Sequence, residues 1–280
     1  MKSIWQLLRL EHGIMYGLGV LVGIFIASPG FCEYTKAIFG FLTAVFLQAS
    51  AFALNDYLDY EVDLINKRFD RPLVRGDLKR EHALILSILL LPFGLLSAYL
   101  ISLEAFLLAA LIVALGYMYN FKLKEYGIVG NIYIAFSMAV PFAFGSIVAI
   151  GNITNGVLAL SIIAFLSGLG REIMKGIEDV VGDSIRNVKS IARVKGLRFA
   201  SKLSAILFLV AVSISVVPAL IIDNYMDLKY IIPILIADII LIYTALNLIK
   251  MYEREHIRSY RRMTLIAMMF GLIGFLFGAF

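Results

Sequence analysis

Charge, cysteine and histidine are all scarce in this sequence. Only 16% of its 280 residues are charged and 61% are hydrophobic, with a mean hydropathy of +0.91. This composition excludes an ordinary soluble domain and predicts an integral membrane protein. The single cysteine, Cys32, excludes an intramolecular disulfide, and three scattered histidines exclude a zinc cluster or another His-based metal site. Any bound metal is therefore expected on oxygen ligands.

Long uncharged runs are what the sequence has instead. They occupy residues 13–32, 37–54, 83–103, 105–121, 126–170, 203–222 and 263–280, and a further apolar run, 230–249, contains a single acid, Asp238. A membrane-spanning helix needs about 20 residues, so the run 126–170 is expected to form two helices with a turn at 151–156. The sequence predicts an all-α membrane protein, a bundle of nine transmembrane helices forming one domain over residues 1–280.

The basic residues predict the orientation of these helices. Of the 25 Lys and Arg, all except Lys36 and Lys229 fall before the first span or in alternate loops, namely 55–82, 120–126, 170–202 and 249–262. Because cytoplasmic loops carry the excess of Lys and Arg, the N-terminus is expected in the cytoplasm and the C-terminus outside. The first span is expected to be retained rather than cleaved as a signal peptide. The pattern predicts a multi-pass protein of the cell membrane. It indicates contact with membrane lipids and not binding to nucleic acid.

An acidic segment follows the second predicted span. If that span continues as a helix, Asp56, Asp59 and Asp63 fall at i, i+3 and i+7 on one face. Three carboxylates on one face repel each other, so the face needs a cation, and an all-oxygen cluster suits Mg²⁺ that bridges to phosphate oxygens. An alternative is an ordinary solvated acidic face at a helix end.

A second acidic segment follows the sixth span. Asp179 and Asp183 lie at i and i+4 on one predicted helical face, with Lys175 one turn and Arg171 two turns earlier. Four spans separate the two segments, so both are expected on the cytoplasmic side. Ordinary ion pairing along a helix explains the second segment alone, but the two segments together favour a metal–phosphate site.

A short basic loop after the fourth span contains Lys122 and Lys124. By itself it indicates only a cytoplasmic loop. Beside two carboxylate clusters it has a further use, because Lys and Arg neutralise phosphate oxygens through charge-assisted hydrogen bonds. Either lysine is therefore a candidate for contact with a diphosphate.

These segments resemble the UbiA superfamily of intramembrane prenyltransferases, and the resemblance extends over essentially the whole chain. The first family motif, N-D-x-x-D-x-x-x-D followed by R-P, and the second, R-E-x-x-K followed by D-x-x-x-D, are both present. The matching positions are Asn55, Asp56, Asp59, Asp63, Arg71, Pro72, Arg171, Glu172, Lys175, Asp179 and Asp183. Nine spans is also the number found in the family.

The resemblance implies a Mg²⁺-dependent enzyme that breaks an allylic carbon–oxygen bond and releases diphosphate. Its implied catalytic residues and Mg²⁺ ligands are Asp56, Asp59, Asp63, Asp179 and Asp183. The residues expected to bind the diphosphate of a polyprenyl donor are Asn55, Arg68, Arg71, Lys122, Lys124, Arg171 and Lys175. The residues expected to bind the acceptor, a lipid phosphate, are Arg9, His12 and Tyr119.

The acceptor is indicated by the positions at which this sequence agrees with some members of the family and differs from others. The pattern is most similar to archaeal members that transfer a geranylgeranyl group from geranylgeranyl diphosphate to the glycerol hydroxyl of geranylgeranylglyceryl phosphate, an ether-lipid precursor. Members that act on aromatic acceptors often show R-P-x-N in the first span, whereas this chain has Arg9-Leu10-Glu11-His12. An aromatic or quinone-precursor acceptor stays open as an alternative.

Two other classes of membrane protein carry acids in helical bundles. A secondary transporter is expected to hold them near the midplane of the membrane, whereas here the acidic segments lie at the cytoplasmic ends of spans. A CDP-alcohol phosphotransferase carries a D-G-x-x-A-R pattern that is absent from this sequence. The acid Asp238 does lie in mid-span, and we expect it to be protonated or paired within the bundle rather than to take part in the site.

Overall fold

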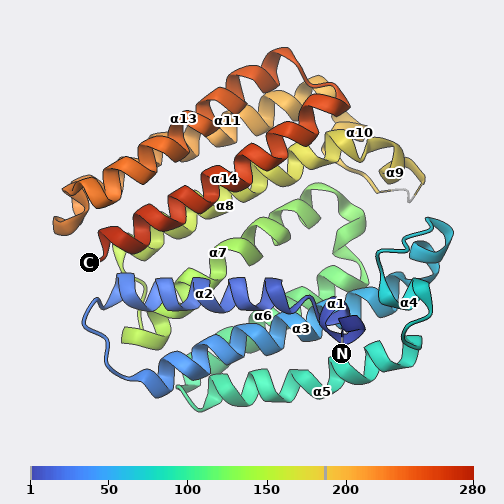
Figure 1. Ribbon diagram of the computed structural model, residues 1–280, viewed down its shortest axis with the longest axis horizontal. Coiled ribbons are helices and arrows are strands. Elements are labelled where there is room, and N and C mark those ends of the chain that lie inside the picture. The colour runs from blue at the N-terminus through green and yellow to red at the C-terminus, as the bar shows by residue number, and fades with distance from the viewer. Residues whose placement is uncertain (1, 186–187) are drawn as a thin grey trace.

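The computed structural model describes residues 2–185 and 188–280, and this part of the chain is helical, without strands. Long helices run side by side along the molecule (Figure 1). The elements are α1 Lys2–Leu8, α2 Leu10–Ala27, α3 Tyr34–Ile65, α4 Pro72–Arg75, α5 Arg80–Tyr99, α6 Leu103–Phe121, η1 Leu123–Tyr126, α7 Ile128–Ile150, α8 Asn155–Glu178, α9 Val180–Ile185, α10 Ile191–Lys195, α11 Leu197–Ser215, α12 Val217–Ile221, η2 Asp223–Met226, α13 Leu228–Lys250 and α14 Arg254–Gly278.

Within the described residues, nine helical segments are long and apolar enough to cross a membrane: α2, α3, α5, α6, α7, α8, α11 with α12, α13 and α14. This confirms the predicted number and order of the spans. The run 126–170 is divided where the turn was predicted, because α7 ends at Gly151, whose φ of 70° ends the helix. Thr154 then accepts a hydrogen bond from the Val157 N–H and caps α8.

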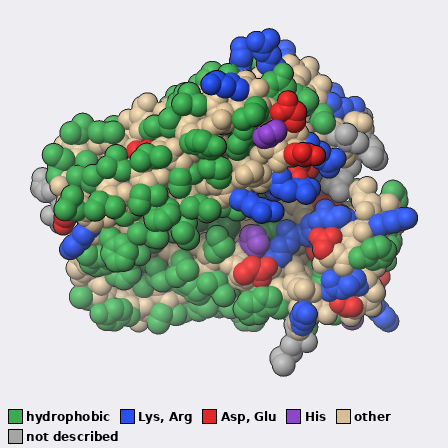
Figure 2. Space-filling model, turned by 45° about the horizontal axis from the view of Figure 1, so that its top comes forward, with side chains coloured by type: hydrophobic (Ala, Val, Ile, Leu, Met, Phe, Trp, Pro, Cys, Tyr) green, Lys and Arg blue, Asp and Glu red, His purple; other side chains and the backbone are tan. Residues whose placement is uncertain are grey.

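The helices form two groups, which meet where α7 of one group packs against α8 of the other. Figure 1 shows α2, α3, α5, α6 and α7 together, and α8, α11, α13 and α14 together, with α7 packed against α8. Each group has its own buried apolar cluster, one including Ile24 and Phe144 and the other Met174 and Phe208. The surface of the bundle is largely hydrophobic along its length (Figure 2), as expected of a surface that faces lipid.

The helix α3 is longer than a span requires and carries the first acidic segment beyond its apolar part. It continues to Ile65, so the prediction that Asp56, Asp59 and Asp63 lie on one continuous helix is confirmed. The helix α8 behaves differently, since it ends at Glu178 and leaves Asp179 between α8 and α9. The predicted helix through Asp183 is therefore interrupted at Asp179. The residues Val180–Ile185 are helical again as α9, and the Asp183 N–H donates to the Asp179 carbonyl at 2.8 Å, so the predicted i to i+4 relation of the two aspartates is kept across the interruption.

The first span occupies only part of the uncharged run 13–32. Its helix ends at Ala27, because the Ser28-Pro29 step disfavours helical backbone. It is also separated from α1 by Arg9, which has left-handed backbone angles, φ 46° and ψ 53°. The acid Asp238 in α13 is paired within the bundle as predicted, since Ser215 donates a hydrogen bond to its Oδ2 at 2.7 Å.

Candidate active site

A cavity of about 830 Å³ opens among the charged residues of the bundle. Figure 2 shows basic and acidic side chains gathered around a hollow at one end of the molecule. Side chains from α2, α3, α6, α7 and α8 line the cavity, together with the segments that follow α3, α6 and α8. Both acidic segments of the sequence therefore reach one cavity, although they lie far apart along the chain.

Most of the predicted site residues line this cavity. They are Arg9, His12, Asn55, Asp59, Arg68, Arg71, Tyr119, Lys124, Arg171, Lys175, Asp179 and Asp183. Three predicted residues do not line it. Lys122 is exposed where α6 ends, whereas Asp56 and Asp63 are buried, with 2% and 5% of their surface exposed. The geometry thus favours Lys124 over Lys122 as a cavity residue.

Asp59 is held by a lysine of η1 and by an asparagine of its own helix. Its Oδ1 accepts a hydrogen bond from Lys124 Nζ at 2.5 Å, and its Oδ2 accepts one from Asn55 Nδ2 at 3.1 Å. Asn55 also donates to the side-chain oxygen of Asn120 at 3.1 Å. Asn120 was not predicted as a site residue, although a buried asparagine in the last turn of an apolar helix is a signal of a polar contact.

Asp56 is held by arginines instead. A single oxygen, Oδ1, accepts hydrogen bonds from Arg9 Nη2 at 2.8 Å and from Arg71 Nη1 at 2.6 Å. Arg71 Nε also lies 3.9 Å from Asp63 Oδ2. The repulsion expected among the carboxylates of α3 is therefore offset by arginine side chains. In the described part of the chain no three Asp, Glu, His or Cys side chains converge as a ready-made metal cluster.

The second acidic segment is flanked by two cations and an additional carboxylate. Glu172 accepts a hydrogen bond from Arg171 at 3.3 Å and lies 3.6 Å from Lys175 Nζ. Glu178, the last residue of α8, accepts hydrogen bonds from Arg261 Nη1 at 2.6 Å and from Arg258 Nε at 3.3 Å. These contacts fix the end of α8 against α14, next to Asp179. Arg258 and Arg261 were not predicted, because their pairing depends on the packing of α14 against α8.

The loop after α3 carries a separate ion pair. Arg68 donates to both carboxylate oxygens of Asp70, at 2.9 and 2.8 Å. This paired geometry holds the pKa of Asp70 below its usual range. Arg68 therefore lines the cavity with part of its charge already neutralised.

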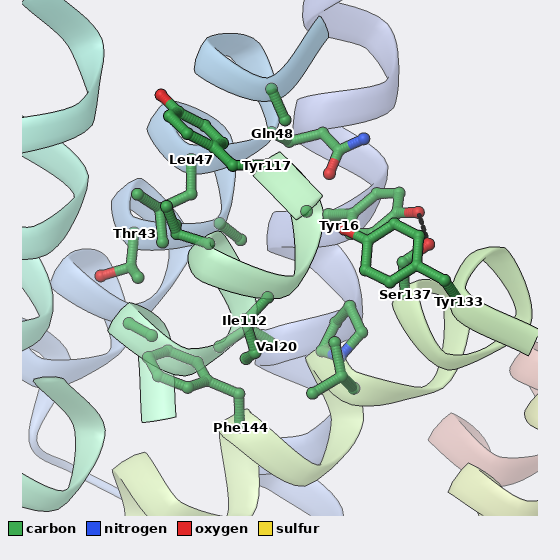
Figure 3. A pocket seen from close by; sticks show the side chains of 17 residues that line it. Tyr16, Val20, Thr43, Leu47, Gln48, Ile112, Tyr117, Tyr133, Ser137 and Phe144 are labelled. Atoms are coloured by element: carbon green, nitrogen blue, oxygen red, sulfur yellow. Dashed lines mark hydrogen bonds between the residues drawn. The ribbon is translucent and has the colours of Figure 1, made fainter. Parts of the chain in front are cut away.

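A smaller pocket of about 70 Å³ adjoins the charged cavity. Figure 3 shows its apolar wall, which includes Val20, Leu47, Ile112 and Phe144. The two spaces share the lining residues Tyr16, Gln48, Ala51, Gly116, Tyr133 and Ser137. A hydrogen bond of 3.1 Å joins the hydroxyls of Tyr16 and Ser137, drawn as a dashed line in Figure 3. A charged cavity that leads into an apolar pocket suits an amphiphilic ligand with an anionic head and a hydrocarbon tail.

The UbiA prenyltransferase family matches residues 17–274 of the sequence. The chain belongs to this family. It is 56% identical to the digeranylgeranylglyceryl phosphate synthase of Archaeoglobus fulgidus, over 100% of this chain and 96% of that protein. It is 31% identical to the protein of the same name from Saccharolobus solfataricus, over 100% of this chain and 97% of that one.

Solved structures of the UbiA family have the same fold. A structure of a digeranylgeranylglyceryl phosphate synthase has a TM-score of 0.85 and 30% sequence identity, and the match covers 99% of this chain and 98% of that chain. A UbiA homologue from A. fulgidus bound to GPP and Mg²⁺ has a TM-score of 0.68 and 20% identity, over 96% of this chain and 98% of that one. Family membership confirms the resemblance based on the two acidic motifs, and it identifies the protein as an intramembrane prenyltransferase with several membrane-spanning helices.

Proposed function

We propose that this UbiA enzyme transfers a geranylgeranyl group from geranylgeranyl diphosphate to the glycerol hydroxyl of geranylgeranylglyceryl phosphate, in the archaeal cell membrane. The observation that carries the proposed reaction is the single cavity that joins two acidic segments, a set of cations and an apolar pocket. The choice of acceptor is supported by the relatives named as digeranylgeranylglyceryl phosphate synthases. The whole chain, 1–280, acts as one domain in this proposal, because both helix groups contribute to the cavity.

Mg²⁺ fits the donor set of the cavity. Asp59, Asp179 and Asp183 line it, and carboxylate oxygens without His or Cys are the ligands that Mg²⁺ prefers. Asp63, which the resemblance also implied as a ligand, is buried and does not line the cavity, so we leave it out of the proposed set. When bound, Mg²⁺ supplies Lewis-acid neutralisation of the leaving diphosphate.

The cations of the cavity are proposed to bind the donor. Lys124, Arg171 and Lys175 come from two sides of the cavity and lie close to the acidic segments. As the allylic carbon–oxygen bond breaks, negative charge grows on the diphosphate, and preorganised cations stabilise that charge. The glycerol oxygen then bonds to the allylic carbon and loses its proton, so no strong base is needed in advance.

The allylic carbon becomes positively charged in this reaction and needs walls that exclude water. Tyr119 and Tyr133 stack at 4.7 Å between ring centroids, and both line the cavity. Aromatic faces stabilise a nearby cation through their quadrupole. The shared lining of the cavity and the apolar pocket supports a donor whose diphosphate lies among the charges and whose prenyl chain enters the pocket.

The proposed place of the prenyl chain predicts an effect of Ala51→Phe on donor length. Ala51 lines both spaces, so a phenyl ring there is expected to block the passage between them. The preference for geranylgeranyl diphosphate over the shorter geranyl diphosphate, measured as the ratio of kcat/KM values, should fall about tenfold or more, since each unburied CH₂ loses about 0.8 kcal/mol. Leu111→Phe is the control, because Leu111 is 55% exposed on α6. An unchanged ratio in Ala51→Phe would place the prenyl chain elsewhere.

The reaction itself is tested by diphosphate release from purified enzyme with geranylgeranyl diphosphate and Mg²⁺. We expect release to depend on geranylgeranylglyceryl phosphate and to yield one doubly alkylated glyceryl phosphate per diphosphate. Hydroxylated aromatic acceptors should not replace the lipid. Equal turnover with an aromatic acceptor would support the alternative acceptor class, and the absence of release with every acceptor would overturn the proposal.

We infer that the N-terminus lies in the cytoplasm and the C-terminus outside. The inference is supported by the distribution of Lys and Arg and by the positions of the termini at opposite ends of the helices in Figure 1. With the exposed Cys32 replaced by Ser, single cysteines introduced by Lys79→Cys and Phe280→Cys test it. In sealed right-side-out cells an impermeant thiol reagent should label only Phe280→Cys, and Lys79→Cys should react after permeabilisation. Labelling of Lys79→Cys in sealed cells would reverse the orientation.

A further inference from the structure

The geometry points to Asp56 as a positioning residue that holds Arg9 and Arg71 together as a receptor for a phosphate monoester, and not as a metal ligand. The inference rests on the proposed function for the identity of the ligand, which is the phosphate of the lipid acceptor. It also separates Asp56 from Asp59, which the sequence places in the same group.

The hydrogen bonds of the Asp56 side chain are both to arginines. Its carboxylate is 2% exposed, and Oδ1 accepts from both Arg9 Nη2 and Arg71 Nη1. Mg²⁺ requires near-octahedral coordination and usually keeps several waters, so its ligands need an open position. Asp59, Asp179 and Asp183 line the cavity, whereas Asp56 does not. The second oxygen of Asp56 is buried without a hydrogen bond in the described structure.

The two arginines meet at the cavity from different elements. Arg9 stands between α1 and α2, and Arg71 precedes α4. Both residues line the cavity, with 21% and 18% of their side-chain surface exposed. Each uses one nitrogen on Asp56, which leaves further N–H donors, and Arg71 Nε is buried without a hydrogen bond. Two adjacent guanidinium groups match the several acceptor oxygens and double charge of a phosphate monoester.

The backbone conformation at Arg9 also supports the proposed phosphate receptor. Left-handed angles cost free energy for a residue with a side chain, and such strain persists only where the surroundings impose it. Here the Arg9 guanidinium lies 4.3 Å from the centroid of the Phe52 ring. His12 packs against the edge of the same ring at 5.5 Å. The break between α1 and α2 thus delivers the Arg9 side chain to the cavity and to Asp56.

The receptor is separate from the cations assigned to the donor. Lys124 belongs to η1, and Arg171 and Lys175 belong to α8, whereas Arg9 and Arg71 belong to the segments around α1 and α4. The reaction has two anionic substrates, one with a diphosphate and one with a phosphate monoester. Two groups of cations on different elements correspond to these two anions.

Two substitutions at Asp56 separate anchoring from metal binding. Asp56→Asn removes the charge that a metal ligand needs but keeps an oxygen that accepts from Arg9 and Arg71. Asp56→Ala removes both. We expect Asp56→Asn to keep Mn²⁺ affinity, measured by electron paramagnetic resonance on the full-length enzyme, within about twofold of the parent protein, while Asp59→Asn weakens it more than tenfold. Asp77→Asn is the control. Asp77 does not line the cavity, so this substitution should leave the Mn²⁺ affinity unchanged.

The ligand is tested with two acceptors that differ only in the phosphate. Arg9→Gln and Asp56→Ala should raise the KM for geranylgeranylglyceryl phosphate by roughly tenfold to a hundredfold, the range for a lost charged hydrogen bond. The KM for geranylgeranyl diphosphate should stay unchanged. The rate with geranylgeranylglycerol, which has no phosphate, should be the same in these variants as in the parent enzyme. Asp56→Asn should retain most of the affinity for the phosphorylated acceptor, because the asparagine side chain keeps an oxygen that can hold the two arginines.

Each failure has its own signature. Loss of Mn²⁺ affinity in Asp56→Asn would make Asp56 a metal ligand and overturn the inference. A raised KM for the donor alone in Arg9→Gln would move Arg9 to the diphosphate site and overturn it as well. If the parent enzyme does not use geranylgeranylglyceryl phosphate at all, the proposed function fails and the phosphate receptor with it, whereas the Mn²⁺ measurement still decides whether Asp56 binds metal.

Discussion

Asp59→Asn and Asp183→Asn are each expected to lower kcat by a factor of about 10²–10³ or more, while the protein stays folded in the membrane. Both carboxylates line the one cavity where the donor diphosphate is proposed to bind. Loss of one preorganised electrostatic contact to the leaving group costs this much in other enzymes, and each variant replaces a proposed carboxylate ligand of Mg²⁺ by a neutral amide. The measurement is the initial rate of diphosphate release at saturating donor and acceptor. We also expect the parent enzyme to lose all activity after chelation of divalent cations.

The control for these variants is Glu61→Gln. Glu61 lies on the same helix, two residues after Asp59, but its side chain is 68% exposed and pairs with Arg80. It should retain nearly full activity, because an exposed ion pair contributes little. Full activity in both aspartate variants, or after complete removal of divalent cations, would contradict the proposed role of the acidic segments.

Gly145→Ala and Gly23→Ala are expected to have the largest effects on stability. The helices α2 and α7 cross so closely that a Cβ at Gly23 would overlap the carbonyl of Phe142, and a Cβ at Gly145 would overlap the carbonyl of Val20. Backbone atoms cannot move aside as a flexible side chain does, so the two helices must separate. We expect each substitution to cost about 1–3 kcal/mol or more and to lower the thermal unfolding midpoint in detergent by roughly 5–10 °C.

Gly271→Ala in α14 is the matched control, since nothing lies within 4 Å of the added Cβ. It should leave the unfolding midpoint unchanged or raise it slightly, because alanine has the higher helix propensity. Activity should fall in Gly23→Ala and Gly145→Ala together with stability, as α2 and α7 both line the cavity. Unchanged unfolding midpoints in both variants would mean that the α2–α7 crossing is looser than the structure has it.

The spans were predictable from the sequence because the signal for them is local. A segment such as 203–222 is uncharged over its whole length, and the bilayer selects such segments as helices regardless of their neighbours. The turn at Gly151 was predictable for the same reason, since glycine tolerates the positive φ that ends α7. The helical repeat places Asp59 and Asp63 one turn apart once the second span continues as a helix, and α3 does continue to Ile65.

The division of roles among the acidic residues depended on tertiary structure. Asp56 and Asp59 are three positions apart on one helix, and nothing in their spacing predicts that arginines hold the first while a lysine and an asparagine hold the second. The partners Arg9 and Lys124 come from distant parts of the chain. Their arrival at these carboxylates depends on how the helices pack.

What the sequence by itself determined is therefore the set of membrane helices, their order and the presence of two acidic segments, because hydropathy and helical periodicity act within one segment. Only the tertiary structure decided which charges share the cavity, that Lys124 rather than Lys122 lines it, and that an apolar pocket adjoins it. Helices in a membrane pack through close contact between small residues, such as Gly23 and Gly145, and through shape complementarity. Those contacts join residues far apart in the chain, so no local pattern of hydropathy or charge contains them.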